Sequence, residues 1–306
     1  MAALIEPKAG ESFGDMACGS GLSLIALAEA CEDSSPACKV YGQDINPIEA
    51  SLAQMNLVMH GIDGHQIACG DSIRNPRFVV GGQQLQQFDV QVSHPPFAVD
   101  EWGYEEASND PFGRYTYGIP PKNRSDYSFI LHMVAMMKVG SGRMAVIVQK
   151  GVLTRGGAEA EIRRALLKDN LLDAVIDLPE KSCFGTVIQV SVMILRRDRV
   201  RRDVLFVDAS KSFVAGKINT LSEADIEKIV GVYKDPHVSE GFSFLASVED
   251  IEANDCSFAP HHYIKAESSK KVVSIDVLLA RQKDLTVDLL SLQAEMDQIV
   301  AEAGIQ

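Results

Sequence analysis

The sequence lacks several features that would point to particular classes of protein. No apolar run approaches about 18 residues and no signal-peptide pattern opens the chain, so we expect no membrane span, no export and a cytoplasmic location. Six cysteines are scattered without a CxxC pair or a Cys/His array, which predicts reduced thiols and no metal site. No internal repeat is evident.

Positive charge is also scarce. The chain has 29 Lys and Arg against 42 Asp and Glu, a formal net charge of -13, which argues against attraction of the whole surface to a polyanion. A nucleic-acid partner would be met by a local patch or through another subunit. Lys122 with Arg124 is one candidate patch. The arginines of residues 196–202 are another, although they fit a solvated connection between two strands equally well.

What is present favours a large α/β protein. A length of 306 residues and 46% hydrophobic content suffice for one large core plus an appendage. Apolar runs alternating with amphipathic segments predict a doubly wound, Rossmann-like sheet of seven strands with a C-terminal helical extension. We expect residues 1–210 to form the sheet domain and residues 211–306 the extension, which has an irregular segment and a long helix over 274–303. The predicted strands lie in residues 12–17, 39–43, 65–68, 89–93, 143–149, 172–178 and 186–195.

One stretch suggests chemistry on an amine. A short buried strand ends in His94, Pro95, Pro96 and Phe97, and the prolines stop its hydrogen-bond ladder. These residues present a side-chain acceptor, a backbone carbonyl and a flat ring toward one small volume. Enzymes that methylate exocyclic amino groups need such acceptors, and a ring against which an extruded base can stack. In isolation, a proline-terminated strand that packs Phe97 into the core explains the motif too.

The first predicted strand leads into a glycine turn. Gly19 and Gly21 precede a helix over 22–30, where glycine allows close approach of a ligand to the helix amino terminus. Such a turn also occurs in doubly wound folds that bind nothing. About 25 residues farther on, Asp44 ends the second strand and is placed to accept hydrogen bonds from two ribose hydroxyls, or to cap a helix. Asp71, after the third strand, could accept from the amino group of an adenine ring.

Four successive strands thus each deliver a candidate ligand group at their carboxyl ends, the edge at which open α/β sheets bind ligands.

Two other segments could contact DNA or a partner protein. The long loop after Phe97 carries Trp102, Tyr104 and Tyr115, which could stack bases or pack on a neighbouring subunit. In the helix over 274–303, apolar residues recur at spacings of three and four, which favours a partner helix over packing on its own domain.

Taken together, these motifs resemble the modification subunits of type I restriction-modification systems, a family of N6-adenine DNA methyltransferases. The glycine turn reads DMACGSG, the second strand GQDINP, and the fourth strand ends in His-Pro-Pro-Phe where the family has Asn-Pro-Pro-Phe. Downstream, the strings GRMAVIVQKGVL and VIDLPEKSCFGT follow in the family order. The resemblance covers most of the chain.

This resemblance implies methyl transfer from S-adenosylmethionine to the N6 of a flipped adenine in DNA. It implies a specificity subunit that reads the DNA sequence and is contacted by the terminal helix, and a complex that a restriction (nuclease) subunit can join. The catalytic residues implied are His94, Pro95, Pro96 and Phe97. The cofactor-binding residues implied are Asp15, Cys18, Gly19, Gly21, Asp44 and Asp71, of which Asp15 would bind the cofactor's amino group.

Three departures from the family bear on activity. Asp44 replaces the more frequent Glu, and we expect cofactor binding to survive. His94 replaces the catalytic Asn and offers a single, differently directed acceptor, so we expect turnover reduced by about a hundredfold, equivalent to roughly 3 kcal/mol. The family's amino-terminal helical domain and a Thr-Pro cofactor-binding segment do not precede the glycine turn, which predicts weak cofactor affinity. Two alternatives stay open: a catalytically silent assembly subunit, and a protein-glutamine methyltransferase.

Overall fold

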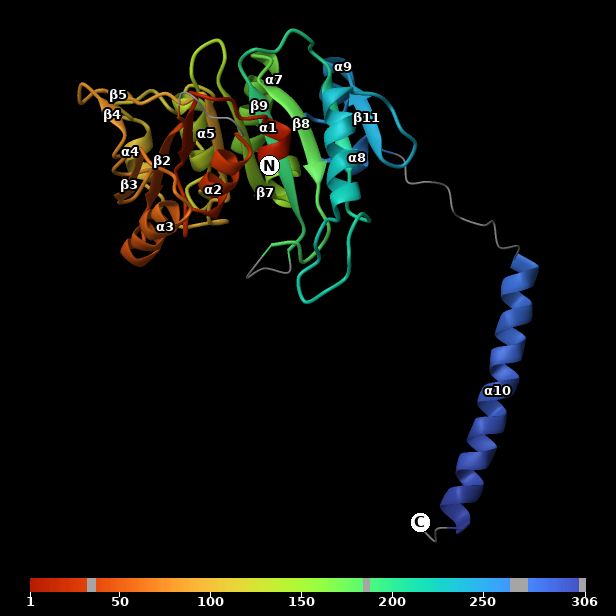
Figure 1. Cartoon of the computed structure of the whole chain (residues 1–306). Coiled ribbons are helices and arrows are strands. Elements are labelled where there is room, and N and C mark those ends of the chain that lie inside the picture. Colours follow the sequence, from red (N-terminus) through yellow and green to blue (C-terminus); the bar gives the residue numbers. More distant parts are fainter. Residues whose placement is uncertain (32–36, 184–187, 265–274, 303–306) are drawn as a thin grey trace. The chain divides into compact units, whose positions relative to one another are not determined.

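The computed structural model describes residues 1–31, 37–183, 188–264 and 275–302. Contacts divide the chain into a compact unit, Met1–Lys265, and a second unit, Ala266–Gln306. The described part of the second unit is one long helix, α10 (Ile275–Glu302), close to the predicted helix over 274–303 (Figure 1). Within the described residues, no helix is both long enough and apolar enough to cross a bilayer.

A single large sheet runs through the compact unit. Its strands are β1 (Ser12–Asp15), β2 (Lys39–Asp44), β3 (His65–Cys69), β6 (Val90–Ser93), β7 (Arg143–Gln149), β8 (Leu172–Asp177), β9 (Val190–Arg196), β10 (Val204–Asp208) and β11 (Ser243–Ala246). Across the sheet they follow the order β11-β10-β8-β9-β7-β6-β1-β2-β3. Strands β9 and β11 run antiparallel to their neighbours, and all other pairs are parallel. Strands β4 (Val79–Val80) and β5 (Gln84–Leu85) form a separate hairpin.

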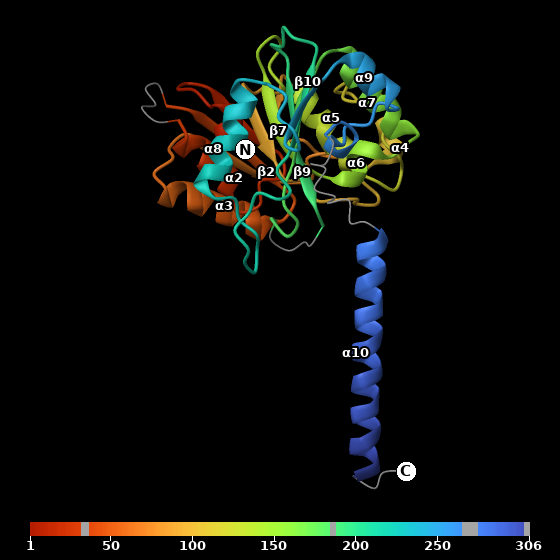
Figure 2. The ribbon, with the colours of Figure 1, turned by 90° about the vertical axis from the view of Figure 1, so that its right-hand side faces the viewer.

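Helices cover both faces of this sheet, which confirms the doubly wound α/β fold (Figure 2). Strand β7 shows why both faces are covered: Met144, Val146 and Val148 enter one core, and Ala145 enters the other. The first core also receives α5 (Asp126–Met136), α6 (Lys150–Thr154), α7 (Ala158–Lys168) and α9 (Val248–Ala253); the second receives α1 (Ala2–Ile5), α2 (Leu22–Glu29), α3 (Pro47–Met59) and α8 (Glu223–Lys234).

The predicted size of the sheet was wrong, because the described residues form a sheet of nine strands rather than seven. All seven predicted strands have a counterpart, although residues 186 and 187 of the last one lie outside the described residues, and β10 and β11 extend the sheet beyond β8. Strand β10 is a buried run of only five residues behind an arginine-rich segment, and β11 is a four-residue antiparallel edge strand. Length alone does not explain why they were not predicted, because β1 and β6 have only four residues each; β10 directly follows a charged segment, and β11 is a partly buried edge strand without a clear alternating pattern.

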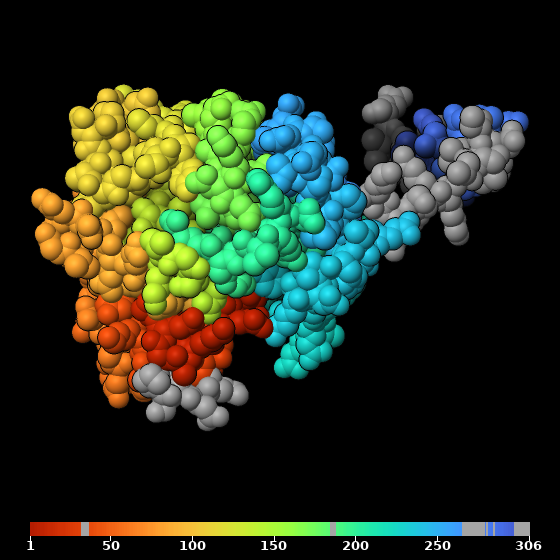
Figure 3. Space-filling view, turned by 90° about the horizontal axis from the view of Figure 1, so that it is seen from above, coloured from red at the N-terminus to blue at the C-terminus, as the bar shows by residue number. Residues whose placement is uncertain are grey.

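Residues 211–264 belong to the compact unit, so the predicted domain boundary at residue 210 divides residues that pack together. Helix α8 begins with a capping box at Ser222, whose hydroxyl accepts from the backbone N–H of Asp225. Strand β11 then pairs with β10, and Phe244 lies opposite Phe206 in register. In the space-filling view, residues near 250 (blue) cover the compact unit on the side away from residues near 75 (orange) (Figure 3).

The position of β1 fixes where a ligand can bind. Strand β1 pairs with β2 on one side and with β6 on the other, so Phe13 lies between Val40 and Val90. The chain order reverses at this point, and the carboxyl ends of β1, β2, β3 and β6 meet at one edge of the sheet. Open α/β sheets bind ligands in the crevice at such a reversal.

Candidate active site

A cavity of about 830 Å³ lies at the reversal point of the sheet. Segments that follow all four of these strands line it: Gly19 after β1, Asp44 at the end of β2, Asp71 after β3, and the residues from His94 to Phe97 after β6. The structure therefore brings together seven of the ten predicted site residues. Asp15, Cys18 and Gly21, the other three, do not line the cavity.

The two glycines of the turn have different environments. Gly19 has a φ of +49°, and a Cβ there would meet nothing nearer than the Glu49 carboxylate at 4.0 Å, so the space above it is open. Gly21 has a φ of +83°, and a Cβ there would lie 3.2 Å from the Cα and Cβ of Ala53 in α3. Gly19 therefore leaves room at the cavity, whereas Gly21 allows α2 and α3 to pack closely.

Asp44 joins the glycine turn to the start of α3. One carboxylate oxygen accepts from the backbone N–H of Gly19 at 2.8 Å, and the other accepts from the N–H of Asn46 at 2.9 Å. The Asn46 side chain in turn caps α3 by accepting from the N–H of Ile48. Asp44 is half-buried and lines the cavity, so its remaining lone pairs face the space that a ligand would occupy.

Asp71 begins the loop after β3. Its Oδ1 accepts from the backbone N–H groups of Ile73 and Arg74 at 2.8 and 3.0 Å, which fixes the carboxylate at the cavity wall. Gln43, a fully buried residue of β2, holds the same loop through three hydrogen bonds, with the carbonyls of Gly70 and Asn75 and the N–H of Arg77. The sequence analysis missed this role, because a glutamine inside a strand gives no signal of its own.

Asp15 lies beneath the cavity wall with only 2% of its surface exposed. Its Oδ1 accepts from the hydroxyl of Ser93 at 2.8 Å and from the backbone N–H of Ala17 at 3.0 Å, so it links the end of β1 to the end of β6. Burial raises the pKa of Asp15 to about 7. Cys18 is also buried; its side chain packs in the sheet core, and burial raises its thiol pKa.

The segment from His94 to Phe97 forms another wall. His94 and Phe97 are half-buried, and their ring centroids lie 5.3 Å apart at an interplanar angle of 47°. Burial lowers the pKa of His94 below its ordinary value of 6.5, so the imidazole is neutral at neutral pH. Within the described residues neither ring nitrogen of His94 has a hydrogen-bond partner, which leaves both available to a ligand.

The chain after Phe97 is held in an uncommon backbone conformation. Ala98 and Glu101 both have positive φ, of 48° and 55°. The start of α5 holds this turn, because the Ser125 hydroxyl accepts from the N–H of Val99 at 3.0 Å and a carboxylate oxygen of Asp126 lies 3.4 Å from the N–H of Ala98. Non-glycine residues with this backbone concentrate at functional sites.

The loop of residues 98–125 packs largely against itself. Trp102 has 3% of its surface exposed and donates from its indole N–H to the carbonyl of Pro121 at 3.0 Å. Arg114 is also buried, forms an ion pair with Asp110, and donates to the carbonyl of Ile73 at 2.7 Å. Trp102 lines the cavity but is fixed within the loop, so it forms part of the cavity wall, a role that the sequence analysis did not predict, and its burial does not favour a free stacking surface.

Carboxylates dominate the charged lining of the cavity. Five acidic residues line it against a single arginine, Arg74, whose guanidinium donates to the carbonyl of Glu101. Such a lining favours a ligand that carries positive charge. The acidic residues are Asp44, Glu49, Asp71, Asp100 and Glu101.

The sequence analysis missed several residues of the cavity wall. Ile45, which directly follows Asp44, is 68% exposed there and offers an apolar surface. Glu49 comes from the first turn of α3 and Phe129 from α5. The position of Ile45 after an acidic strand end is a signal that could have found it. Phe129 could not have been found from sequence, because α5 reaches the cavity through the tertiary fold.

The arginine cluster lies at the opposite edge of the sheet from the cavity. Arg199 is buried and forms an ion pair with Asp173 at 2.9 Å, and Arg196 pairs with Asp198 at 2.8 Å. Arg201 also pairs with Asp173, so two aspartates are shared by three of the five arginines, and these contacts favour a structural role for Arg196 and Arg199 over a nucleic-acid patch. In the described part of the chain, no three His, Cys, Asp or Glu side chains are grouped so that they could hold a metal ion.

Comparison with known proteins gives a consistent family. A family model described as N-6 DNA Methylase matches residues 1–272. The type I restriction enzyme MjaVII methylase subunit of Methanocaldococcus jannaschii is 32% identical over 289 residues, which is 89% of this chain and 48% of that protein. The MpnII methylase subunit of Mycoplasma pneumoniae is 30% identical over 290 residues, 89% of this chain and 53% of that protein.

A solved structure is similar to this chain as well. The crystal structure of the type I restriction-modification system methyltransferase subunit from Streptococcus thermophilus matches with a TM-score of 0.78 and 32% identity, over 86% of this chain and 58% of that one. The chain spans about half the length of the curated relatives it matches.

Proposed function

The chain belongs to the N-6 DNA methylase family, and from that premise we propose that it is the modification subunit of a type I restriction-modification system. In this role it transfers a methyl group from S-adenosylmethionine to the N6 of adenine in DNA. The observation that carries the proposal is the meeting of four strand ends at one acidic cavity. The proposal includes a cytoplasmic location.

The chemistry of the cavity fits the cofactor. S-adenosylmethionine carries a sulfonium and an ammonium group, and five carboxylates line the cavity. Asp44 would accept from the ribose hydroxyls, Asp71 from the adenine amine, and the open space above Gly19 would let the cofactor approach the backbone. Ile45 supplies an apolar surface for the adenine ring. Asp15 would act from beneath, by joining the glycine turn to the catalytic segment through Ser93.

The segment from His94 to Phe97 would hold the target base. Phe97 offers a half-buried ring on which a flipped adenine can stack. The neutral imidazole of His94 and the carbonyl of Pro95 would accept the two N–H groups of the exocyclic amine, which leaves the nitrogen lone pair free to attack. The bound cofactor supplies the electrophilic methyl group. The new N–CH3 bond would replace the S–CH3 bond, S-adenosylhomocysteine would be the neutral leaving group, and the amine would release one proton to solvent, so that N6-methyladenine is neutral.

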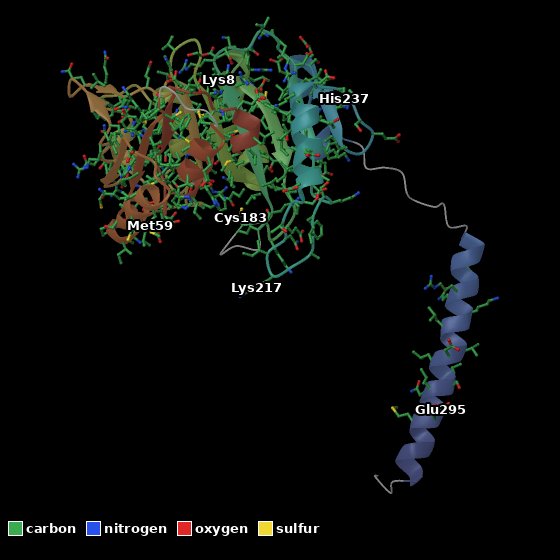
Figure 4. All side chains as sticks on the ribbon, in the orientation of Figure 1. Lys8, Met59, Cys183, Lys217, His237 and Glu295 are labelled. Carbon is green, nitrogen blue, oxygen red and sulfur yellow. The ribbon has the colours of Figure 1, made fainter. Side chains whose placement is uncertain are left out.

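Helix α10 would bind the specificity subunit. Its exposed side chains include four apolar residues spaced at four, three and four residues, which place one apolar stripe along the helix: Leu285, Leu289, Leu292 and Met296. Such a stripe fits a helical partner. Figure 4 shows the described side chains projecting from α10, with Glu295 labelled. A partner that reads DNA explains how a chain with a net charge of -13 can act on DNA.

A catalytically silent assembly subunit is the second candidate, because His94 stands where the family has Asn. Transfer of tritium from labelled S-adenosylmethionine to adenine-containing duplex DNA, with the specificity subunit present, separates the two. Slow transfer that His94→Asn accelerates supports the enzyme. No transfer by either protein, with the complex intact, supports the silent subunit. A glutamine peptide in parallel tests the protein-glutamine methyltransferase alternative.

A further inference from the structure

We propose that Glu49 is a second ribose-binding carboxylate, which works together with Asp44. This inference rests on the proposed function, since it assumes a nucleoside cofactor in the cavity. Glu49 lies in the first turn of α3, directly after the strand end that carries Asp44, and it lines the cavity. The family resemblance assigns no role to this position.

The two carboxylates meet at the glycine turn from different elements. Asp44, from β2, accepts from the Gly19 N–H at 2.8 Å. Glu49, from α3, has a carboxylate oxygen 4.0 Å from the point where a Cβ of residue 19 would sit. Both side chains are half-buried, so each keeps a fixed approach to the cavity while remaining accessible to a ligand.

Their hydrogen bonding differs, and this difference carries the inference. Both oxygens of Asp44 already hold backbone N–H groups, of Gly19 and Asn46. Within the described residues, the Glu49 carboxylate has no hydrogen-bond or ion-pair partner. A free carboxylate at a cavity wall is a strong acceptor for a hydroxyl donor.

The pair also explains how Asp44 can replace the longer Glu of the family. A ribose presents two neighbouring hydroxyl groups, and the shorter Asp44 side chain is tied to the loop on both oxygens. Glu49, whose side chain is one methylene group longer than that of Asp44, approaches Gly19 from α3. One hydroxyl would donate to Asp44 and the other to Glu49.

The test compares two ligands on the full chain. S-adenosylhomocysteine carries both the ribose and the amino-acid part, whereas 5′-methylthioadenosine lacks the amino-acid part. Glu49→Gln should raise the Kd of both by the same factor, about tenfold for one charge-assisted hydrogen bond. Glu227→Gln, an exposed glutamate of α8 far along the sheet, is the matched control and should change neither Kd.

The hydroxyls can be tested directly as well. Wild type should bind adenosine with a lower Kd than 2′,3′-dideoxyadenosine. Glu49→Gln should reduce the ratio of these two Kd values. An unchanged Kd for both nucleosides and both thioethers in Glu49→Gln would overturn the inference. A Kd increase confined to S-adenosylhomocysteine would overturn it too, because Glu49 would then contact the amino-acid part. If wild type binds none of these ligands at millimolar concentration, the proposed cofactor site itself fails.

Discussion

Burial gives Asp15 a different chemistry from the carboxylates that line the cavity. Its pKa is about 7 in the folded protein, against 3.8 as the ordinary value. As pH rises from about 4 to 7, the unfolded chain releases this proton before the folded protein does, so folding is progressively opposed. Above pH 7 the penalty is constant, with an upper bound of roughly 4 kcal/mol. Asp15 is thus retained at a cost to stability.

Asp15→Asn should therefore raise the free energy of unfolding, and by more at pH 8 than at pH 5. The amide oxygen can still accept from the Ser93 hydroxyl and the Ala17 N–H. Urea unfolding at the two pH values measures the gain. Asp63→Asn, an exposed aspartate, is the control and should show no such pH dependence. A variant that is less stable than wild type at pH 8 would contradict this reading of Asp15.

His94 sets the expected rate of the proposed reaction. His94→Asn should raise turnover about a hundredfold, because an amide oxygen replaces an imidazole nitrogen that is directed differently (about 3 kcal/mol). The wild-type rate should also fall in acid, as the imidazole becomes protonated at its lowered pKa, and the variant should lack that acid limb. Methyl-transfer rates over pH 5–8, with the specificity subunit present, measure both effects.

The control for this variant is His60→Asn, which changes an exposed histidine paired with Glu29. It should leave the rate and its pH dependence unchanged. Equal rates for wild type and His94→Asn, in complexes of equal stability, would show that His94 takes no part in the reaction.

At the scale of the structural elements, the two glycines of the turn have different roles: Gly21 allows helices to pack closely, and Gly19 leaves room for a ligand. Gly21→Ala would place a Cβ 3.2 Å from Ala53 at a φ of +83°, so we expect a loss of about 2–4 kcal/mol in the free energy of unfolding. Gly19→Ala meets only the Glu49 carboxylate, at 4.0 Å, and should cost about 1–2 kcal/mol from its φ of +49°.

Binding should rank the two variants in the opposite order. Gly19→Ala should weaken S-adenosylhomocysteine binding at least tenfold, because the new methyl group occupies open space at the cavity. Gly21→Ala, measured at a temperature where it is folded, should bind almost as wild type does. Thermal unfolding measures the stability of both variants, and a binding titration measures their affinity for S-adenosylhomocysteine. A larger binding loss in Gly21→Ala would reverse the roles assigned to the two glycines.

The apolar stripe of helix α10 is predicted to contact the specificity subunit. Leu289→Asp puts a charge in the middle of the apolar stripe and should abolish copurification with the specificity subunit. Val287→Asp changes an equally exposed residue on the opposite side of the helix, 65% against 61%, and should leave the complex intact. Size-exclusion chromatography of the coexpressed subunits measures this. Loss of the complex in both variants, or in neither, would remove the stripe as the contact.

At the scale of the whole molecule, the predictable strands were those with a long buried apolar run or with a distinctive motif at the carboxyl end, such as the glycine turn after β1 and the two prolines after β6. Strands β7 and β9 are buried along nearly their whole length, so their apolar runs stand out in the sequence. Strand β10 directly follows an arginine-rich segment and has no motif at its end, and the edge position of β11 leaves it without a clear alternating pattern. The Ser222 capping box at the start of α8 is a local signal that a sequence can show.

The candidate site was predictable only where chemistry falls at strand ends. Asp44, Asp71 and the segment after β6 could be found because parallel strands place their carboxyl ends together. Glu49 and Phe129 come from helices, and their approach to the cavity depends on how those helices pack. The burial of Asp15 depends on its partner Ser93, 78 residues away in the chain, which no local pattern reveals.

The central claim is that one cavity binds both the methyl donor and the target adenine. Tritium transfer from labelled S-adenosylmethionine to duplex DNA, by the His94→Asn protein with its specificity subunit, tests this claim most directly. We predict label on adenine N6, strongly reduced by a further Asp44→Ala or Phe97→Ala substitution and unaffected by His60→Asn. An intact complex that binds DNA and cofactor yet labels no adenine would contradict it.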